Sequence, residues 1–247
     1  MSKKKENPKS NLPMLIIAGV LLVAMIGGWY LLTRPASPTA SDANRANSAP
    51  AAKKNATIPP NAPKGAQPPT QAGSPTAAVV LEEFADFQCG SCAAVNPTMN
   101  EIKSIYGSKI NFIFRNYPLS MHDKAYDAAV AAEAAGMQGK FWDMQNLIFT
   151  NQAVWTRSDT HKQAFKEYAQ KIGLDIARWE NDILGIAAKS RVDEDLKRGR
   201  AIGVDSTPSL YINGNLVPFN EMRNIQSMRA MIDAELAKVS QPAEPQQ

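Results

Sequence analysis

The feature that most constrains the fold of this chain is a Cys-x-x-Cys pair, Cys89 and Cys92, which holds its only two cysteines. The apolar, β-prone run before it, residues 78–87, predicts a buried strand, and the residues after Cys89 predict a helix. At a helix N-terminus, unpaired N–H groups and the helix dipole stabilise an anion. We therefore expect a lowered pKa for the thiol of Cys89, and the thiolate is the form that attacks disulfides. Cys92, one turn further on, can attack Cys89 in return and release a mixed disulfide.

Two other uses of the cysteine pair fit the sequence less well. A structural zinc site normally needs four Cys or His ligands in paired spacing, and the two histidines, His122 and His161, are isolated. A purely structural disulfide closing so short a loop would remove little entropy from the unfolded chain. A redox-active dithiol needs a strand, a turn and a helix around the motif, and the flanking pattern supplies them. The sequence therefore predicts a dithiol site without a metal or a cofactor.

The N-terminus carries an apolar stretch without charges, residues 14–32, preceded by four lysines. A helix of about 20 such residues crosses the hydrocarbon core of a bilayer. The lysine excess predicts a basic cytoplasmic tail (1–13), a single-pass membrane anchor (14–33) and a catalytic domain in the periplasm or outside the cell. A cleaved signal peptide is the alternative, but its apolar core is usually shorter and ends at small residues. Both interpretations export the rest of the chain.

Residues 34–75 contain mostly Ala, Pro, Ser, Asn, Thr and Gly, with almost no large apolar side chain. Such a segment cannot bury enough surface to offset its ordering entropy, so we expect a disordered linker. Residues 1–76 also carry nine of the 27 Lys and Arg but two of the 23 Asp and Glu, which leaves the rest of the chain acidic. The basic balance therefore belongs to the tail and the linker, and it does not indicate a nucleic-acid partner.

The remaining pattern predicts one folded domain over residues 76–240, followed by a disordered tail, 241–247. A second strand is expected at 109–115, and a helical insertion at about 120–200. The insertion ends in a charged, solvated helix, 191–200, whose inner stripe is expected to contain Val192, Leu196 and Ile202. The Asn213-Gly214 turn predicts a hairpin between 209–212 and 215–217. Asn220 is expected to cap a last helix, 221–238.

This order of elements resembles the thioredoxin fold in its DsbA-like form, over about residues 77–238. Three segments carry the resemblance: Phe84 to Cys92; Arg115 to Trp142; and Gly203 to Gly214, which contains Thr207-Pro208. The resemblance implies an α/β fold, a thioredoxin domain with an inserted helical subdomain, here preceded by the predicted transmembrane helix and disordered linker. Membrane-anchored and secreted bacterial members of this type are thiol-disulfide oxidoreductases, mostly donors of disulfides to exported proteins.

Transferred residue by residue, the resemblance makes Cys89 the nucleophile and Cys92 the resolving thiol. It implies that Pro208 follows a cis peptide bond and lies against the dithiol. In that position it would leave the backbone groups of Thr207 free to pair with a substrate strand and would prevent metal capture. An ordinary proline at the start of a strand is the alternative for Pro208.

Glu83 matches a family position that holds a buried acid beneath the active site. A desolvated carboxylate has a raised pKa and can exchange a proton with a buried thiol. Strand alternation puts Glu83 and Cys89 on one face and Glu82 on the other. An acid at the flank of the strand that faces water is the alternative. His122 matches a position common in relatives, but the sequence indicates no role for it.

The resemblance implies an enzyme of the cell envelope that donates or exchanges disulfides with exported proteins and is reoxidised by a DsbB-like or VKOR-like, quinone-linked membrane partner. Gly90-Ser91 replaces the Pro-His of the family's strongest oxidant and offers the thiolate no cation. We therefore expect Cys89 to be less acidic than in that oxidant, and the protein less oxidising. A membrane-tethered reductase or isomerase and a non-catalytic binding or chaperone module are the alternatives.

Overall fold

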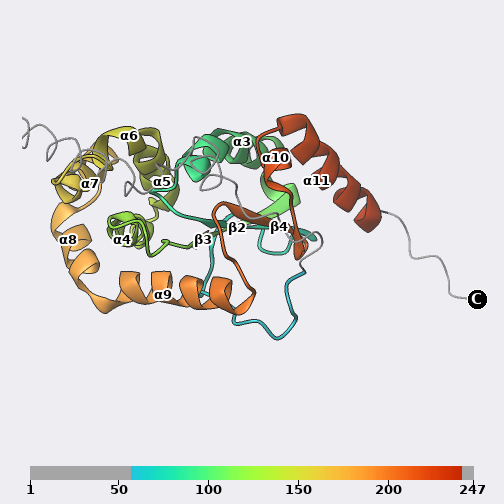
Figure 1. The fold of residues 1–247 in the computed structure, drawn as a ribbon, viewed down its shortest axis with the longest axis horizontal. Coiled ribbons are helices and arrows are strands. Elements are labelled where there is room, and N and C mark those ends of the chain that lie inside the picture. Colours follow the sequence, from blue (N-terminus) through green and yellow to red (C-terminus); the bar gives the residue numbers. More distant parts are fainter. Residues whose placement is uncertain (1–56, 241–247) are drawn as a thin grey trace, which may run out of the picture. The chain divides into compact units, whose positions relative to one another are not determined.

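The computed structural model describes residues 57–240, which contain a five-stranded mixed sheet (Figure 1). The strand order is β1-β3-β2-β4-β5. Strands β2 and β3 are parallel, because helix α3 connects them, and the other pairs are antiparallel. The strands are β1 Thr70–Gly73, β2 Val79–Ala85, β3 Ile110–Asn116, β4 Ser209–Ile212 and β5 Asn215–Leu216. The predicted strands and hairpin are therefore present, and β1 was not predicted.

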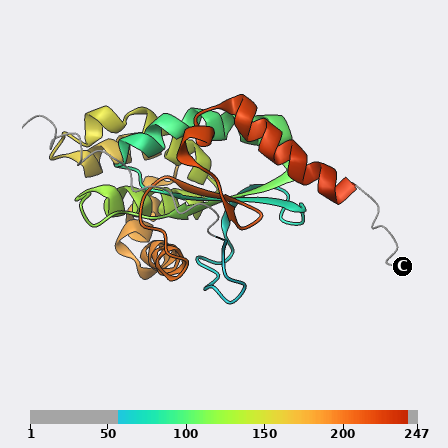
Figure 2. The same cartoon turned by 45° about the vertical axis from the view of Figure 1, so that its right-hand side comes forward.

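Helices cover both faces of this sheet, with α3, α10 and α11 on one face and α9 on the other (Figures 1 and 2). Helices α4 to α8 lie beyond one end of the sheet and, with α9, form the predicted helical insertion between β3 and β4. The helices are α3 Gly90–Tyr106, α4 Ala125–Gly136, α5 Phe141–Thr150, α6 Gln152–Trp155, α7 His161–Lys171, α8 Ile176–Leu184, α9 Ile186–Ala201, α10 Phe219–Met222 and α11 Ile225–Ser240. A 3-10 turn, Gly107–Lys109, follows α3.

The alternation along β2 divides its side chains between the two faces. Leu81 packs in the apolar layer under α3 and α11, whereas Phe84 packs on the other face with Tyr117 and Tyr211. The two acids of the strand therefore point to opposite faces, as predicted. Both are buried, since Glu82 is 5% and Glu83 is 3% exposed.

On the α9 face, Glu82 takes part in a buried network of charges. Arg115 Nε donates to Glu82 at 2.6 Å, and its Nη1 donates to Asp195 at 2.9 Å. Arg198 donates to the second oxygen of Glu82 at 2.6 Å. Asp195 and Arg198 come from α9, so the inner side of this helix carries buried charges beside the predicted apolar stripe of Val192 and Leu196. Asp195 is fully buried, and the network holds α9 against the sheet.

The same network binds the segment before β1. Arg115 donates to the carbonyl oxygens of Lys64 at 2.8 Å and Ala66 at 3.1 Å, and the Ala66 N–H donates to Asp195 at 2.9 Å. Strand β1 then pairs with β3 along Thr70–Gly73. The predicted disordered linker is therefore wrong over residues 57–75, and the folded part begins well before residue 76. Ordering comes from backbone hydrogen bonds to buried side chains, which compensate for the scarcity of apolar residues.

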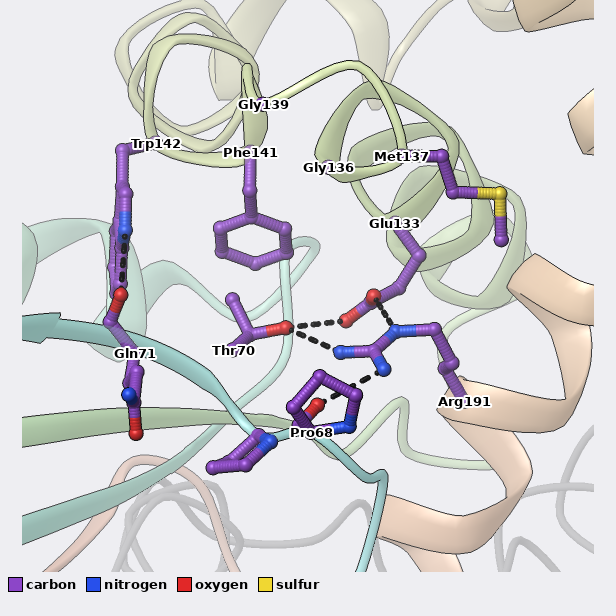
Figure 3. A pocket seen from close by; sticks show the side chains of 11 residues that line it. Pro68, Thr70, Gln71, Glu133, Gly136, Met137, Gly139, Phe141, Trp142 and Arg191 are labelled. Atoms are coloured by element: carbon purple, nitrogen blue, oxygen red, sulfur yellow. Dashed lines mark hydrogen bonds and ion pairs between the residues drawn. The ribbon is translucent and has the colours of Figure 1, made fainter. Parts of the chain in front are cut away.

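Thr70 shows how tightly this segment is fastened (Figure 3). Its hydroxyl donates to Glu133 of α4 at 3.1 Å and accepts from Arg191 of α9 at 2.9 Å. Arg191 also donates to the Pro68 carbonyl oxygen at 3.0 Å. A cavity of about 420 Å³ opens beside these groups, between Pro68 and the ring of Phe141.

The end of the chain departs from the prediction in detail. The last helical region is split into α10 and α11, and Asn224, not Asn220, caps α11 through its side-chain oxygen, which accepts from the N–H groups of Gln226 and Ser227. Within residues 57–240, no helix is long and apolar enough to cross a bilayer. The predicted anchor, 14–33, and tail, 241–247, lie outside the described residues.

We predict that Arg115→Met lowers the free energy of unfolding by about 3–5 kcal/mol, because it leaves Glu82 and Asp195 buried with fewer partners. Urea unfolding of the full chain measures this change. Lys140→Met is the matched control, since Lys140 pairs with Asp143 on the surface and should cost less than about 1 kcal/mol. Equal losses in the two variants would contradict a structural role for the network.

Candidate active site

The two cysteines lie where β2 passes into α3. Cys89 is the N-cap residue of α3, with extended backbone angles and no side chain capping the helix, and Cys92 lies in its first turn. Both thiols are free. Cys92 is 1% exposed, whereas Cys89 is half-buried and reaches the surface. The pair therefore has one accessible sulfur and one covered sulfur.

The segment before β4 meets Cys89 from the other side. The Thr207–Pro208 peptide bond is cis, as the resemblance implied. The Cys89 thiol donates to the Thr207 carbonyl oxygen at 3.4 Å. Residues 118 positions apart in the chain are thus in contact, and the structure brings together Cys89, Cys92, Thr207 and Pro208.

The two thiols differ strongly in acidity. Hydrogen bonding by Cys92 lowers the pKa of Cys89 to about 5, against the opposing effect of burial, and the backbone of Ser91 and Cys92 adds to the lowering. Burial raises the pKa of Cys92 well above its ordinary value, and hydrogen bonding and charge at Cys89 raise it further. A single proton held by Cys92 therefore stabilises the thiolate of Cys89.

Glu83 lies beneath the dithiol, on the face of the sheet that α3 covers. Burial raises the pKa of Glu83 to about 7, although the charge of Lys103 opposes the shift. The Glu83 charge in turn contributes to the raised pKa of Cys92, so the two groups interact electrostatically. The prediction of a buried acid is confirmed, and the alternative of a water-facing acid is wrong.

Lys103 is a residue of this site that the sequence interpretation missed. Burial lowers the pKa of Lys103 to about 8, and the charge of Glu83 opposes this. Its ammonium lies 3.8 Å from the centroid of the Trp142 ring, a cation–π contact. Helical spacing could have identified it, because Lys103 follows Met99 by four residues and thus shares the inner face of α3.

Asp86 fixes the turn that leads into the cysteines. Its buried carboxylate accepts from the N–H groups of Gln88 at 2.6 Å and Leu119 at 2.7 Å, and it pairs with His122 Nδ1 at 2.7 Å. The Asp86 N–H donates to Cys92 Sγ at 3.5 Å. His122 therefore contacts the carboxylate that holds this turn, a role that the sequence did not indicate. An Asp two residues before Gln88 is typical of a side-chain-closed turn.

Within residues 57–240, no group of three or more His, Cys, Asp or Glu side chains is arranged to hold a metal ion. A five-stranded α/β domain with a Cys-x-x-Cys pair at a helix N-terminus and a cis proline against it has the architecture of the thioredoxin fold. A sequence model of the family described as thioredoxin matches residues 66–234. The chain therefore belongs to the thioredoxin family.

Solved structures support the same fold and its helical insertion. BdbD from Bacillus subtilis matches with a TM-score of 0.60 at 20% identity, over 68% of this chain and 93% of that one. The thiol-disulfide exchange protein α-DsbA2 from Wolbachia pipientis matches with a TM-score of 0.58 at 20% identity, over 67% and 86%. At this identity the likeness concerns the fold, which is thioredoxin-like with DsbA-like neighbours.

Curated relatives of higher identity are much longer proteins. The chain is 34% identical over 145 residues to Na(+)/H(+) antiporter NhaA 1 of Mycolicibacterium gilvum, which is 58% of this chain and 23% of that protein. A match to the protein of that name from Salinispora arenicola is 30% identical and covers 67% of this chain and 24% of the relative. The chain thus spans about a quarter of the length of these relatives, and the likeness concerns part of each.

We predict that Cys92→Ala raises the pKa of the Cys89 thiol from about 5 by at least about one unit, toward the usual value of about 8.5. The physical reason is the loss of the hydrogen bond that contributes most to the lowering. The pH dependence of alkylation by iodoacetamide measures this pKa. Cys92→Ser retains a hydroxyl donor and should show a smaller rise. An unchanged pKa in Cys92→Ala would show that other groups stabilise the thiolate.

Proposed function

We propose that the protein is a thiol-disulfide oxidoreductase of the DsbA-like type, acting on exported proteins through Cys89-Gly90-Ser91-Cys92. The observation that carries the proposal is the asymmetry of the two sulfurs. Cys89 reaches the surface with a pKa lowered to about 5, and Cys92 is buried with a raised pKa. The first sulfur suits an attacking and leaving group that meets substrates, and the second suits a resolving group that acts only inside the protein.

Disulfide donation would start from the Cys89–Cys92 disulfide. A substrate thiolate attacks Cys89 Sγ, so a mixed disulfide forms and the bond to Cys92 breaks. Cys92 leaves with the electron pair and, because its pKa is high, takes up a proton, which the carboxyl group of Glu83 can supply. A second substrate thiolate then attacks the substrate sulfur, and Cys89 leaves as a thiolate. Two electrons pass from the substrate, which gains a disulfide, to the dithiol.

The acidity of Cys89 favours this direction over reduction. A low pKa stabilises the reduced state of the pair, which makes the disulfide more oxidising, and it makes Cys89 a good leaving group, which speeds the transfer of the disulfide to the substrate. The missing cation at Gly90-Ser91 does not prevent a low pKa, because Cys92 is the largest cause of the shift. We therefore propose disulfide donation as the main activity. Reduction and isomerisation are the alternatives that the reduction potential would reveal.

The location of the enzyme at the membrane is also proposed. The uncharged stretch 14–33 with its preceding lysines supports a single-pass anchor, which would hold the domain in the periplasm or outside the cell. A donor reduced by its substrates needs reoxidation, and an anchored domain can meet a membrane protein that passes electrons to quinone. We propose such a partner, similar to DsbB or VKOR.

The decisive measurement is the reduction potential of the Cys89/Cys92 pair in the full chain, by equilibration with glutathione buffers. We expect a value well above −200 mV, closer to the roughly −120 mV of a strong oxidant than to the roughly −270 mV of thioredoxin. A value near the latter would make the protein a reductase. A pair that does not exchange with glutathione would support a binding or chaperone module.

We also predict that Cys92→Ser accumulates mixed disulfides with disulfide-containing substrate proteins. The Cys89 thiolate attacks a substrate disulfide and releases one substrate thiolate, and the serine cannot resolve the product. Cys89→Ser should form none and should lose oxidation of a dithiol peptide. Non-reducing electrophoresis after acid quenching detects both. Mixed disulfides through Cys92 in the Cys89→Ser variant would reverse the assigned roles.

Glu83→Gln should slow formation of the mixed disulfide near pH 7 by up to about 100-fold, because it removes the acid that protonates Cys92. Stability gives a second readout. Since the pKa of Glu83 is raised to about 7, the wild type should lose more stability than the variant as pH rises from about 4.5 to about 7. Burial also raises the pKa of Asp195, to about 6, and this acts equally in both proteins. Stopped-flow fluorescence and urea unfolding across pH measure the two effects. An unaltered rate would remove the proton-transfer role.

A further inference from the structure

Gln152, in the helical insertion, contacts the backbone of the active-site turn. Its side-chain amide nitrogen donates to the Phe87 carbonyl oxygen at 2.7 Å and to the Cys89 carbonyl oxygen at 2.9 Å. Both protons of this NH₂ group are therefore used on the turn that presents the nucleophile. The contact joins residues 63 positions apart in the chain.

The helix that carries Gln152 is itself firmly held. α6 is a single turn, and its last residue, Trp155, is fully buried and donates through its indole to the Ile148 carbonyl oxygen at 2.8 Å. The Thr156 hydroxyl donates to the Gln152 carbonyl oxygen at 2.7 Å. The position of the amide is thus set by the core of the insertion.

The turn that accepts these two hydrogen bonds is also held in place. The Phe87 ring is buried against Phe114 and Phe149, with centroid distances of 5.6 Å and 4.8 Å. The Cys89 carbonyl also accepts the first helical hydrogen bond of α3, from Ala93 at 3.2 Å. Gln152 is therefore a second donor on the carbonyl of the reactive residue.

We propose that Gln152 is a positioning residue through which the helical insertion sets the acidity and orientation of the Cys89 thiol. The positive end of the amide N–H dipole points at the Cys89 peptide group, so it offsets the negative carbonyl oxygen next to the thiolate. It also keeps the Phe87–Cys89 turn in the conformation that aims Sγ at Thr207. A thioredoxin fold thereby gains, from its insertion, a thiolate-stabilising group that Gly90 and Ser91 do not supply.

The consequence for disulfide donation rests on the proposed function, whereas the test of Gln152 does not. In the reduced full chain, thiolate absorbance at 240 nm and iodoacetamide alkylation report the pKa of Cys89 without any substrate. Gln152→Met keeps the length of the side chain and removes the donor. We expect the acid dissociation constant of Cys89 to fall about three- to tenfold, the factor that the loss of one net hydrogen bond gives, which leaves about two- to fivefold less thiolate at pH 5.

Gln152→Glu separates this role from simple support of the turn. An ionised carboxylate would face two carbonyl oxygens and add negative charge beside the thiolate, so the pKa should rise further than in Gln152→Met. The expected order of pKa is therefore wild type, then Met, then Glu. Gln163→Met is the control, because the amide of Gln163 donates to Glu167 on the surface, and it should titrate as the wild type does.

Two results would overturn the proposal. One is an unchanged Cys89 titration in both Gln152 variants with the native circular dichroism retained. The other is an equal shift in both, which support of the turn alone would give. If the wild type fails to exchange disulfides but the pKa order is as expected, the proposed function fails and the role of Gln152 stands.

Discussion

Two adjacent buried carboxylates in the central strand are the constraint on which the rest of this domain depends. Glu82 and Glu83 point to opposite faces, and each must be compensated or neutralised, since an unpaired buried charge is costly. Burial alone would raise the pKa of Glu82, but Arg198 and Arg115 outweigh it and the pKa is lowered. Glu83 faces one cation, Lys103, and its pKa is raised to about 7. The first acid stays ionised and builds structure, whereas the second can exchange protons near neutral pH.

The compensation of Glu82 explains the architecture of the α9 face. Arg115 has donors left after Glu82 and Asp195 are bound, and it uses them on the carbonyl oxygens of Lys64 and Ala66. One guanidinium thus connects β2, β3, α9 and the segment before β1. Residues that carry little apolar surface become part of the folded domain because buried charges need their backbone groups as partners.

The need of buried charges for distant partners also limited what could be predicted from the sequence. The strand, the Cys-x-x-Cys helix and the hairpin followed from local patterns, and the fold, the cis bond before Pro208 and the burial of Glu83 followed from the resemblance. The ordered structure of residues 57–75 did not follow from the sequence. Composition indicates how much apolar surface a segment can bury, but it does not indicate hydrogen bonds to distant side chains such as Asp195. The roles of Lys103 and Asp86 at the site were not predicted for a related reason. Periodicity indicates which face of an element a residue lies on, but it does not identify the partner of a buried charge.

The acidity of Cys89 likewise depends on contacts that the local sequence does not reveal. Gly90 and Ser91 predicted a Cys89 less acidic than in the family's strongest oxidant, because neither side chain offers the thiolate a cation. In the folded domain the stabilisation comes from hydrogen bonds, first from Cys92 and then from the backbone of α3. Hydrogen bonds to an ionised acceptor are about twice as strong as neutral ones, so a few well-placed donors can replace one cation. The redox character of such a pair is therefore a property of the surrounding fold, including Gln152 of the insertion, as much as of the dipeptide between its cysteines.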